Sequence, residues 1–61
     1  MQKDDQYYQW LKSQPIDNLA LENVAEMWYY EMHGRIPVKN TEEYEKMYND
    51  WVSYAFADFQ N

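Results

Sequence analysis

This 61-residue chain has no cysteine and only one histidine and one glycine. Disulfides and thiolate metal sites are therefore excluded, and His33 alone cannot form a histidine metal cluster. No stretch approaches the ~20 apolar residues of a membrane span, and the first residues hold no apolar run of signal-peptide length. We expect a cytoplasmic protein without metal or cofactor, stabilised by packing, self-association or a partner.

Basic residues are also scarce, since five Lys and Arg stand against eleven Asp and Glu, giving a net charge of −6. Such a chain repels the phosphates of nucleic acids and anionic membrane surfaces. Across the two longer predicted helices the only Lys or Arg is Lys46, too little for a helix-turn-helix DNA reader. We expect neither direct nucleic-acid binding nor membrane binding.

Aromatic residues, in contrast, are abundant: seven Tyr, three Trp and two Phe make up a fifth of the chain. Disordered segments are poor in aromatics, so this composition favours a folded chain. A single small domain of residues 1–61 can hardly cover so many rings. Because Tyr and Trp are enriched at the energetic centres of interfaces, some of them are expected to face a partner.

The last third of the chain shows the longest apolar stripe and predicts a helix over residues 41–59. Its apolar positions recur at the spacing that places side chains on one face of a helix; they are Tyr44, Tyr48, Trp51, Val52, Ala55 and Phe59. Asn40 followed by Glu43 resembles a capping box at the start of this helix.

A second helix is predicted over residues 18–33, with Asp17 as its N-cap. Gly34 stands where a left-handed C-cap is expected, and Pro37 prevents continuation. The expected core face of this helix consists of Leu21, Val24, Ala25, Trp28 and Met32.

A third, shorter helix is predicted over residues 4–13 and must end before Pro15. Tyr7, Trp10 and Leu11 form its expected apolar face, with Tyr8 to one side. Short connections between these helices predict an all-α fold, a small three-helix domain and most simply a bundle. The alternative is a hairpin of the two longer helices that dimerises into a four-helix arrangement.

Acidic residues on the second helix suggest a binding surface. Glu22 and Glu26 are spaced i, i+4 without a basic residue to relieve them, which costs roughly 0.2–0.5 kcal/mol. Tyr30 and His33 continue the same face, and Met27 lies nearby. On the last helix, Glu42 and Glu43 are expected to pair with Lys46, which leaves the other acidic side chains of this helix without a basic partner. The predicted protein-binding residues are Glu22, Glu26, Met27, Tyr30, His33, Glu45 and Asp50. The alternative is that this acid only keeps the protein in solution.

Catalysis is not expected. His33 can approach Glu26 or Tyr30 along one helix face, but no nucleophile candidate stands beside it and the chain is too short for a closed pocket. We therefore predict no catalytic residues and a protein that is not an enzyme.

In size, charge and lack of catalytic residues, the chain resembles small acidic proteins encoded by phages and mobile elements, including anti-restriction proteins, anti-CRISPR proteins and uracil-DNA glycosylase inhibitors. The likeness is compositional and carries no motif. Carboxylates at i, i+4 lie about 5–6 Å apart, comparable with successive phosphates of a DNA strand. The leading hypothesis is an acidic protein-binding module, an inhibitor of a DNA- or RNA-binding protein or enzyme that works by DNA mimicry or through an aromatic patch. The alternative is a structural or regulatory homo-oligomer, such as a homodimer, that buries its aromatics between subunits.

Overall fold

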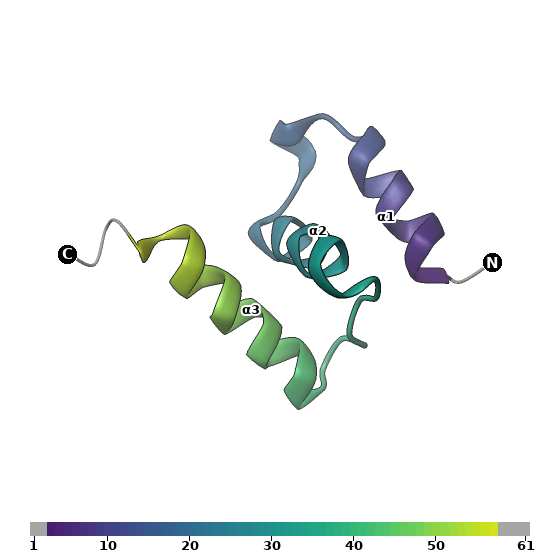
Figure 1. Cartoon of the computed structure of the whole chain (residues 1–61). Coiled ribbons are helices and arrows are strands. Elements are labelled where there is room, and N and C mark those ends of the chain that lie inside the picture. The colour runs from purple at the N-terminus through teal and green to yellow at the C-terminus, as the bar shows by residue number, and fades with distance from the viewer. Residues whose placement is uncertain (1–2, 58–61) are drawn as a thin grey trace.

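A computed structural model describes residues 3–57 of the chain. These residues form three α-helices, α1 (Lys3–Ser13), α2 (Leu21–His33) and α3 (Glu42–Ala55), with a short 3-10 helix, η1 (Ile16–Asn18), after α1. The described range contains no strand. The predicted all-α class with three helices is therefore confirmed (Figure 1). None of these helices has the length and hydrophobicity needed to cross a membrane.

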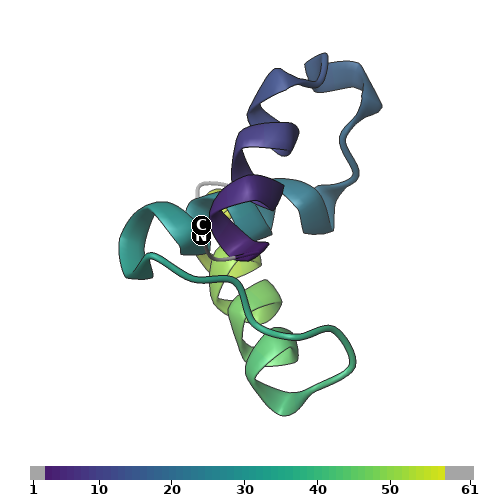
Figure 2. The ribbon, with the colours of Figure 1, turned by 90° about the vertical axis from the view of Figure 1, so that its right-hand side faces the viewer.

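Helix α2 occupies the centre of the fold. It packs against α1 on one side and α3 on the other, whereas α1 and α3 do not pack on each other within residues 3–57. The two views in Figure 1 and Figure 2 show α2 between the other helices. A helix between two partners has two buried faces, and this placement decides which of its polar residues reach solvent.

The main core lies between α2 and α3. Its buried residues are Ala25, Tyr44, Met47 and Trp51, and the partly buried side chains packed against them are Val24, Trp28, Tyr29, Tyr48, Val52 and Phe56. The stripe predicted for α3 is thus confirmed at Tyr44 and Trp51. It missed Met47, and it wrongly included Ala55, which is exposed. Helix α3 ends at Ala55 rather than residue 59, and Phe59 lies outside the described residues.

Helix α1 covers the range predicted for it, but its buried face is rotated. Leu11 is fully buried as expected. Tyr8, predicted to lie to one side, is also buried and stacks on Tyr30 of α2, with 4.3 Å between ring centroids. Trp10, predicted to face the core, is 56% exposed. The aromatic contact with α2 therefore decides which side of α1 turns inward.

Helix α2 begins three residues later than predicted. Residues 16–18 form η1, Leu19 and Ala20 are extended, and Asp17 does not cap α2. The Ala20 N–H instead donates to Oδ1 of Asn23, a 3.0 Å hydrogen bond that satisfies one amide at the helix start. Leu21 then falls in the first turn and is 55% exposed, and Met32 near the other end is 61% exposed, so the assignment of both to the core is wrong.

Both ends of the α2–α3 connection depend on residues in the left-handed region. Gly34 has φ +75°, and its N–H donates to the Tyr30 carbonyl at 2.7 Å, which confirms the predicted C-cap. Asn40 has φ +65°. The N-cap of α3 is Thr41, whose Oγ1 accepts from the Tyr44 N–H at 3.3 Å. The predicted capping box of Asn40 and Glu43 is therefore wrong.

Candidate functional site

Glu26 lies inside the fold, with only 2% of its surface exposed. Its Oε1 accepts hydrogen bonds from the Tyr7 hydroxyl at 2.8 Å and from Nδ2 of Asn23 at 3.1 Å, and its Oε2 accepts from the Tyr44 hydroxyl at 2.8 Å. The prediction that Glu26 extends an exposed acidic surface is wrong. Burying a carboxylate is costly unless donors replace water, and these three side chains provide them.

Other carboxylates are held by tyrosine hydroxyls in the same way. Tyr30 of α2 donates to Asp5 of α1, and Tyr8 of α1 donates to Glu31 of α2 at 3.1 Å. In the connection before α3, the backbone N–H of Ile36 donates to Asp4 at 2.8 Å. These hydrogen bonds attach α1 to α2 and to the connection that follows α2.

Burial, and after it the hydrogen bond to Glu26, together raise the pKa of Tyr7 to about 12. The pKa of Tyr44 is raised by burial first and then by the same carboxylate. Both hydroxyls therefore remain protonated donors at neutral pH. Their pKa values lie far above the operating pH, whereas general acid–base catalysis needs a pKa near it. The cluster of Tyr7, Glu26 and Tyr44 is a structural connection between helices.

The basic loop also has an internal role. Arg35 forms an ion pair with Glu43 at the start of α3, and its guanidinium carbon lies 5.9 Å from the ring centroid of Tyr29. The Tyr29 hydroxyl donates to the same carboxylate at 3.4 Å. Among the described residues no ion pair joins Lys46 to Glu42 or Glu43, so the expected pairing is wrong. A residue across the loop neutralises Glu43 instead.

The predicted surface of α2 is therefore only partly free. Glu22 and His33 are exposed, and the His33 ring lies 4.3 Å from the Tyr29 ring. Met27 and Tyr30 are half-buried, with the Tyr30 hydroxyl occupied by Asp5. Because α1 covers much of this face, it does not present the row of carboxylates and apolar groups that the sequence suggested.

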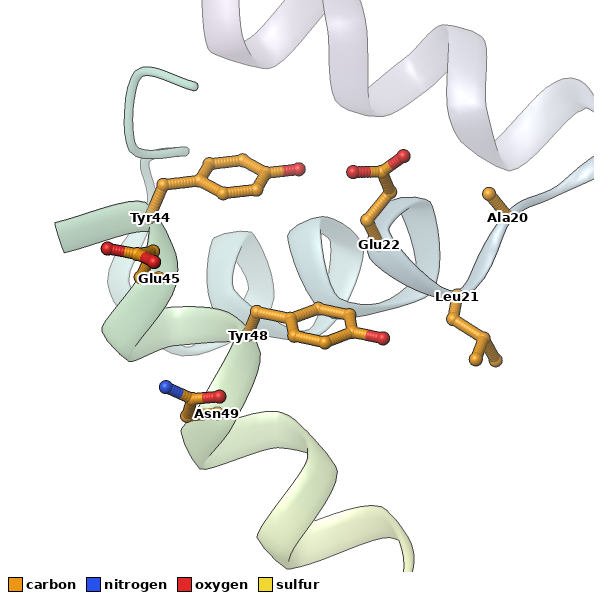
Figure 3. A pocket seen from close by; sticks show the side chains of 7 residues that line it. All are labelled: Ala20, Leu21, Glu22, Tyr44, Glu45, Tyr48 and Asn49. Carbon is orange, nitrogen blue, oxygen red and sulfur yellow. The ribbon is translucent and has the colours of Figure 1, made fainter. Parts of the chain in front are cut away.

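A groove of about 540 Å³ lies between the first turn of α2 and the first half of α3. It is lined by Ala20, Leu21, Glu22, Tyr44, Glu45, Tyr48 and Asn49. Figure 3 shows the rings of Tyr44 and Tyr48 extending from α3 towards the start of α2, where Glu22 and Leu21 lie. The fold thus brings together two residues predicted on separate helices, Glu22 and Glu45.

The groove continues into a second hollow of about 340 Å³, which shares three lining residues and adds Lys39 and Asn40. Asp50 is exposed on α3 but lines neither hollow. Glu22 and Glu45 are both exposed, and neither forms a hydrogen bond or ion pair with another side chain of residues 3–57. The surface combines two free carboxylates with tyrosine rings.

This combination is suited to a cation on an apolar stem. The rings and Leu21 offer apolar contact, the π-faces attract positive charge, and the carboxylates accept hydrogen bonds. The apolar stripe of the last helix predicts Tyr44 and Tyr48 only as core residues and gives no signal for Asn49. The late start of α2, which moves Leu21 to the groove, has no clear signal in the sequence.

Within residues 3–57, no three Asp, Glu, His or Cys side chains gather closely enough to hold a metal ion. No protein-family model, curated protein or solved structure matches the chain. The functional argument therefore depends on the geometry and charge of the groove.

Proposed function

We propose that this protein is a small acidic protein-binding module that inhibits a nucleic-acid-handling protein by binding its basic surface. One observation carries the proposal: Glu22 and Glu45 flank an aromatic groove and have no side-chain hydrogen-bond or ion-pair partner among residues 3–57. Basic residues on a partner would neutralise them, and the half-buried ring of Tyr48 together with exposed Leu21 would add apolar contact.

The acidic residues of the described range fall into two groups, those with a partner inside the fold and those without one. Five acidic side chains accept hydrogen bonds or form the ion pair within the fold, namely Asp4, Asp5, Glu26, Glu31 and Glu43. Glu42 lies three residues before Glu45 and is exposed on the same helix. Residues at this spacing are neighbours on a helix surface, so Glu42 lies beside Glu45, although it lines neither hollow.

This geometry changes the form that DNA mimicry would take. The i, i+4 pair on α2 is lost because Glu26 is buried, and the free carboxylates now come from two helices. A groove with aromatic walls also differs from a row of phosphates. The proposal therefore relies on charge complementarity with a basic partner and on aromatic anchoring, rather than on copying phosphate spacing.

The test is an affinity capture from bacterial lysate with stepwise salt elution, using two charge-matched double variants. Glu22→Gln/Glu45→Gln removes the groove carboxylates, and Asp17→Asn/Asp50→Asn removes two exposed charges outside it. We expect the unmodified protein and the second variant to retain a nucleic-acid-handling protein that elutes at raised salt. The first variant should lose it, and the captured protein should lose nucleic-acid binding when the unmodified protein is added.

Equal retention by both variants would overturn the groove as the binding surface. Equal loss would show that overall charge, rather than this site, holds the partner. Recovery of no nucleic-acid-handling protein would overturn the proposed inhibition.

A homo-oligomer is the second candidate, favoured by large apolar side chains left exposed on the described surface, among them Ile16, Met32, Val38 and Tyr54. Sedimentation equilibrium tests it, because an interface made of these side chains predicts a defined self-complex that resists salt. Tyr30→Asp is a poor probe of such an interface, since it would place a second carboxylate beside Asp5 inside the monomer. Met32→Asp changes an exposed side chain and is the better variant.

A further inference from the structure

We infer that the groove between α2 and α3 binds one arginine side chain from an extended basic segment of the partner. This inference rests on the proposed function and specifies the chemistry of recognition at the same site. It comes from the arrangement of two carboxylates around tyrosine rings, and from the continuation of the groove towards Lys39.

The carboxylates stand on two different helices. Glu22 lines the groove from the first turn of α2 and Glu45 lines it from α3. In Figure 3 the Glu22 carboxylate lies beyond the hydroxyl end of the Tyr44 ring and Glu45 lies near the base of that ring, so a cation placed along the ring has negative charge at either end. A guanidinium presents five N–H donors in a planar fork, which suits carboxylates approaching from separate directions. An ammonium is a compact, strongly hydrated charge that cannot spread across the groove in this way.

The half-buried ring of Tyr48 provides an aromatic surface in the groove that is already ordered, next to the buried ring of Tyr44. The Tyr44 hydroxyl is held by its hydrogen bond to Glu26, and the ring centroids of Tyr48 and Trp51 are 6.1 Å apart. Rings held by internal contacts lose little conformational entropy on binding. Because a guanidinium stacks on aromatic faces as well as attracting them electrostatically, the tyrosines favour arginine over lysine.

The continuation of the groove indicates an extended segment rather than an isolated side chain. The second hollow shares Glu22, Tyr44 and Glu45 with the first and leads to the loop at Lys39 and Asn40. A second copy of this chain fits poorly there, because each copy carries a net charge of −6 and would bring further acid to an acidic rim. A basic side chain of the partner brings the complementary charge at Glu22 and Glu45, whereas the part of the segment beside Lys39 must not be basic.

The experiment compares two synthetic peptides of glycine and serine, one with three spaced arginines and the other with lysines at the same positions. Chemical-shift changes of the full-length, isotope-labelled protein report where each binds and how tightly. We expect the arginine peptide to bind at the groove more tightly than the lysine peptide, by at most about 5-fold, since about 5-fold is the full value of a cation–π contact at an exposed site and lysine keeps part of it.

Four variants test the assignment to the groove. Glu22→Gln/Glu45→Gln should lower the affinity for both peptides, whereas Asp17→Asn/Asp50→Asn should leave the preference for the arginine peptide unchanged. Tyr48→Leu should remove the preference for arginine, and Tyr48→Phe should keep it because the ring remains. The amide spectrum of each free variant verifies that the protein is folded.

The outcomes separate this inference from the proposed function. Equal affinity for the two peptides, or shift changes away from the groove, would overturn the arginine site. The proposed function would still stand if the captured partner were lost from Glu22→Gln/Glu45→Gln alone. If that variant retains the partner while the arginine peptide binds the groove selectively, the groove chemistry holds and the proposed function fails.

Discussion

The Tyr44 hydroxyl of α3 donates a buried 2.8 Å hydrogen bond to Glu26 of α2, 18 residues away in the chain. The other oxygen of the same carboxylate accepts from Tyr7 of α1. Since α1 and α3 do not pack on each other within residues 3–57, this side chain links the two outer helices through the central one. It also holds the Tyr44 ring that lines the candidate groove.

We predict that Glu26→Ala lowers the free energy of unfolding by about 3 kcal/mol or more, because it leaves the hydroxyls of Tyr7 and Tyr44 without their acceptor. Glu22→Ala, at an exposed position of the same helix, should change it by less than about 0.5 kcal/mol. Urea denaturation of the two variants measures the difference. Similar losses for both would contradict the structural role of Glu26.

A second prediction concerns alkaline pH. Tyrosine in the unfolded chain loses its proton near pH 10, whereas folded Tyr7 keeps its proton up to about pH 12 because of burial and Glu26. Between these values the unfolded state binds fewer protons than the folded state. The stabilisation from Tyr7 should therefore be complete below about pH 10 and decrease as the pH rises towards 12.

The measurement is the thermal midpoint as a function of pH for the unmodified protein, Tyr7→Phe and the exposed control Tyr54→Phe. Tyr7→Phe should be less stable at pH 8 and should lose less stability between pH 10 and 12. Tyr54→Phe should follow the unmodified protein. Parallel curves for all three proteins would mean that the Tyr7 hydroxyl does not contribute.

The helices themselves could be predicted because their signals are local. Helical spacing identified all three, and Gly34 followed by Pro37 marked the end of α2 correctly. The predicted start of α2 was wrong because another local structure forms there. Asp17 has the chemistry of an N-cap, but residues 16–18 form a separate 3-10 turn. Competing local structures of similar stability cannot be separated by residue preference alone.

The site was predicted less well because α2 has two packed faces. A single apolar stripe assumes one buried side, and with Ala25 and Trp28 on that side it places Glu26 in solvent. Its burial depends on Tyr7 and Tyr44 from other helices. Such pairings depend on tertiary structure, and no periodicity within one helix reveals them. Glu22 and Glu45 were selected as binding residues, but their shared groove became visible only in the fold.

The start of α3 gives a third prediction. Thr41→Ala should lower the free energy of unfolding by about 1 kcal/mol, because the Tyr44 N–H loses its acceptor. Thr41→Ser keeps the hydroxyl and should stay close to the unmodified protein. Chemical denaturation of both variants makes the comparison. If alanine and serine behave alike, the hydroxyl is not the cap.

The last prediction concerns the end of α2, where Gly34 has φ +75° and a Cβ built on it would have no heavy atom within 4 Å beyond its chain neighbours. Any penalty for a side chain here must come from the left-handed backbone rather than from a clash. We expect Gly34→Ala to lower the free energy of unfolding by about 1 kcal/mol. Gly34→Asn should cost less, although asparagine is larger, because it tolerates this conformation better. Denaturation midpoints that fall with side-chain size instead would show that space, and not φ, limits this position.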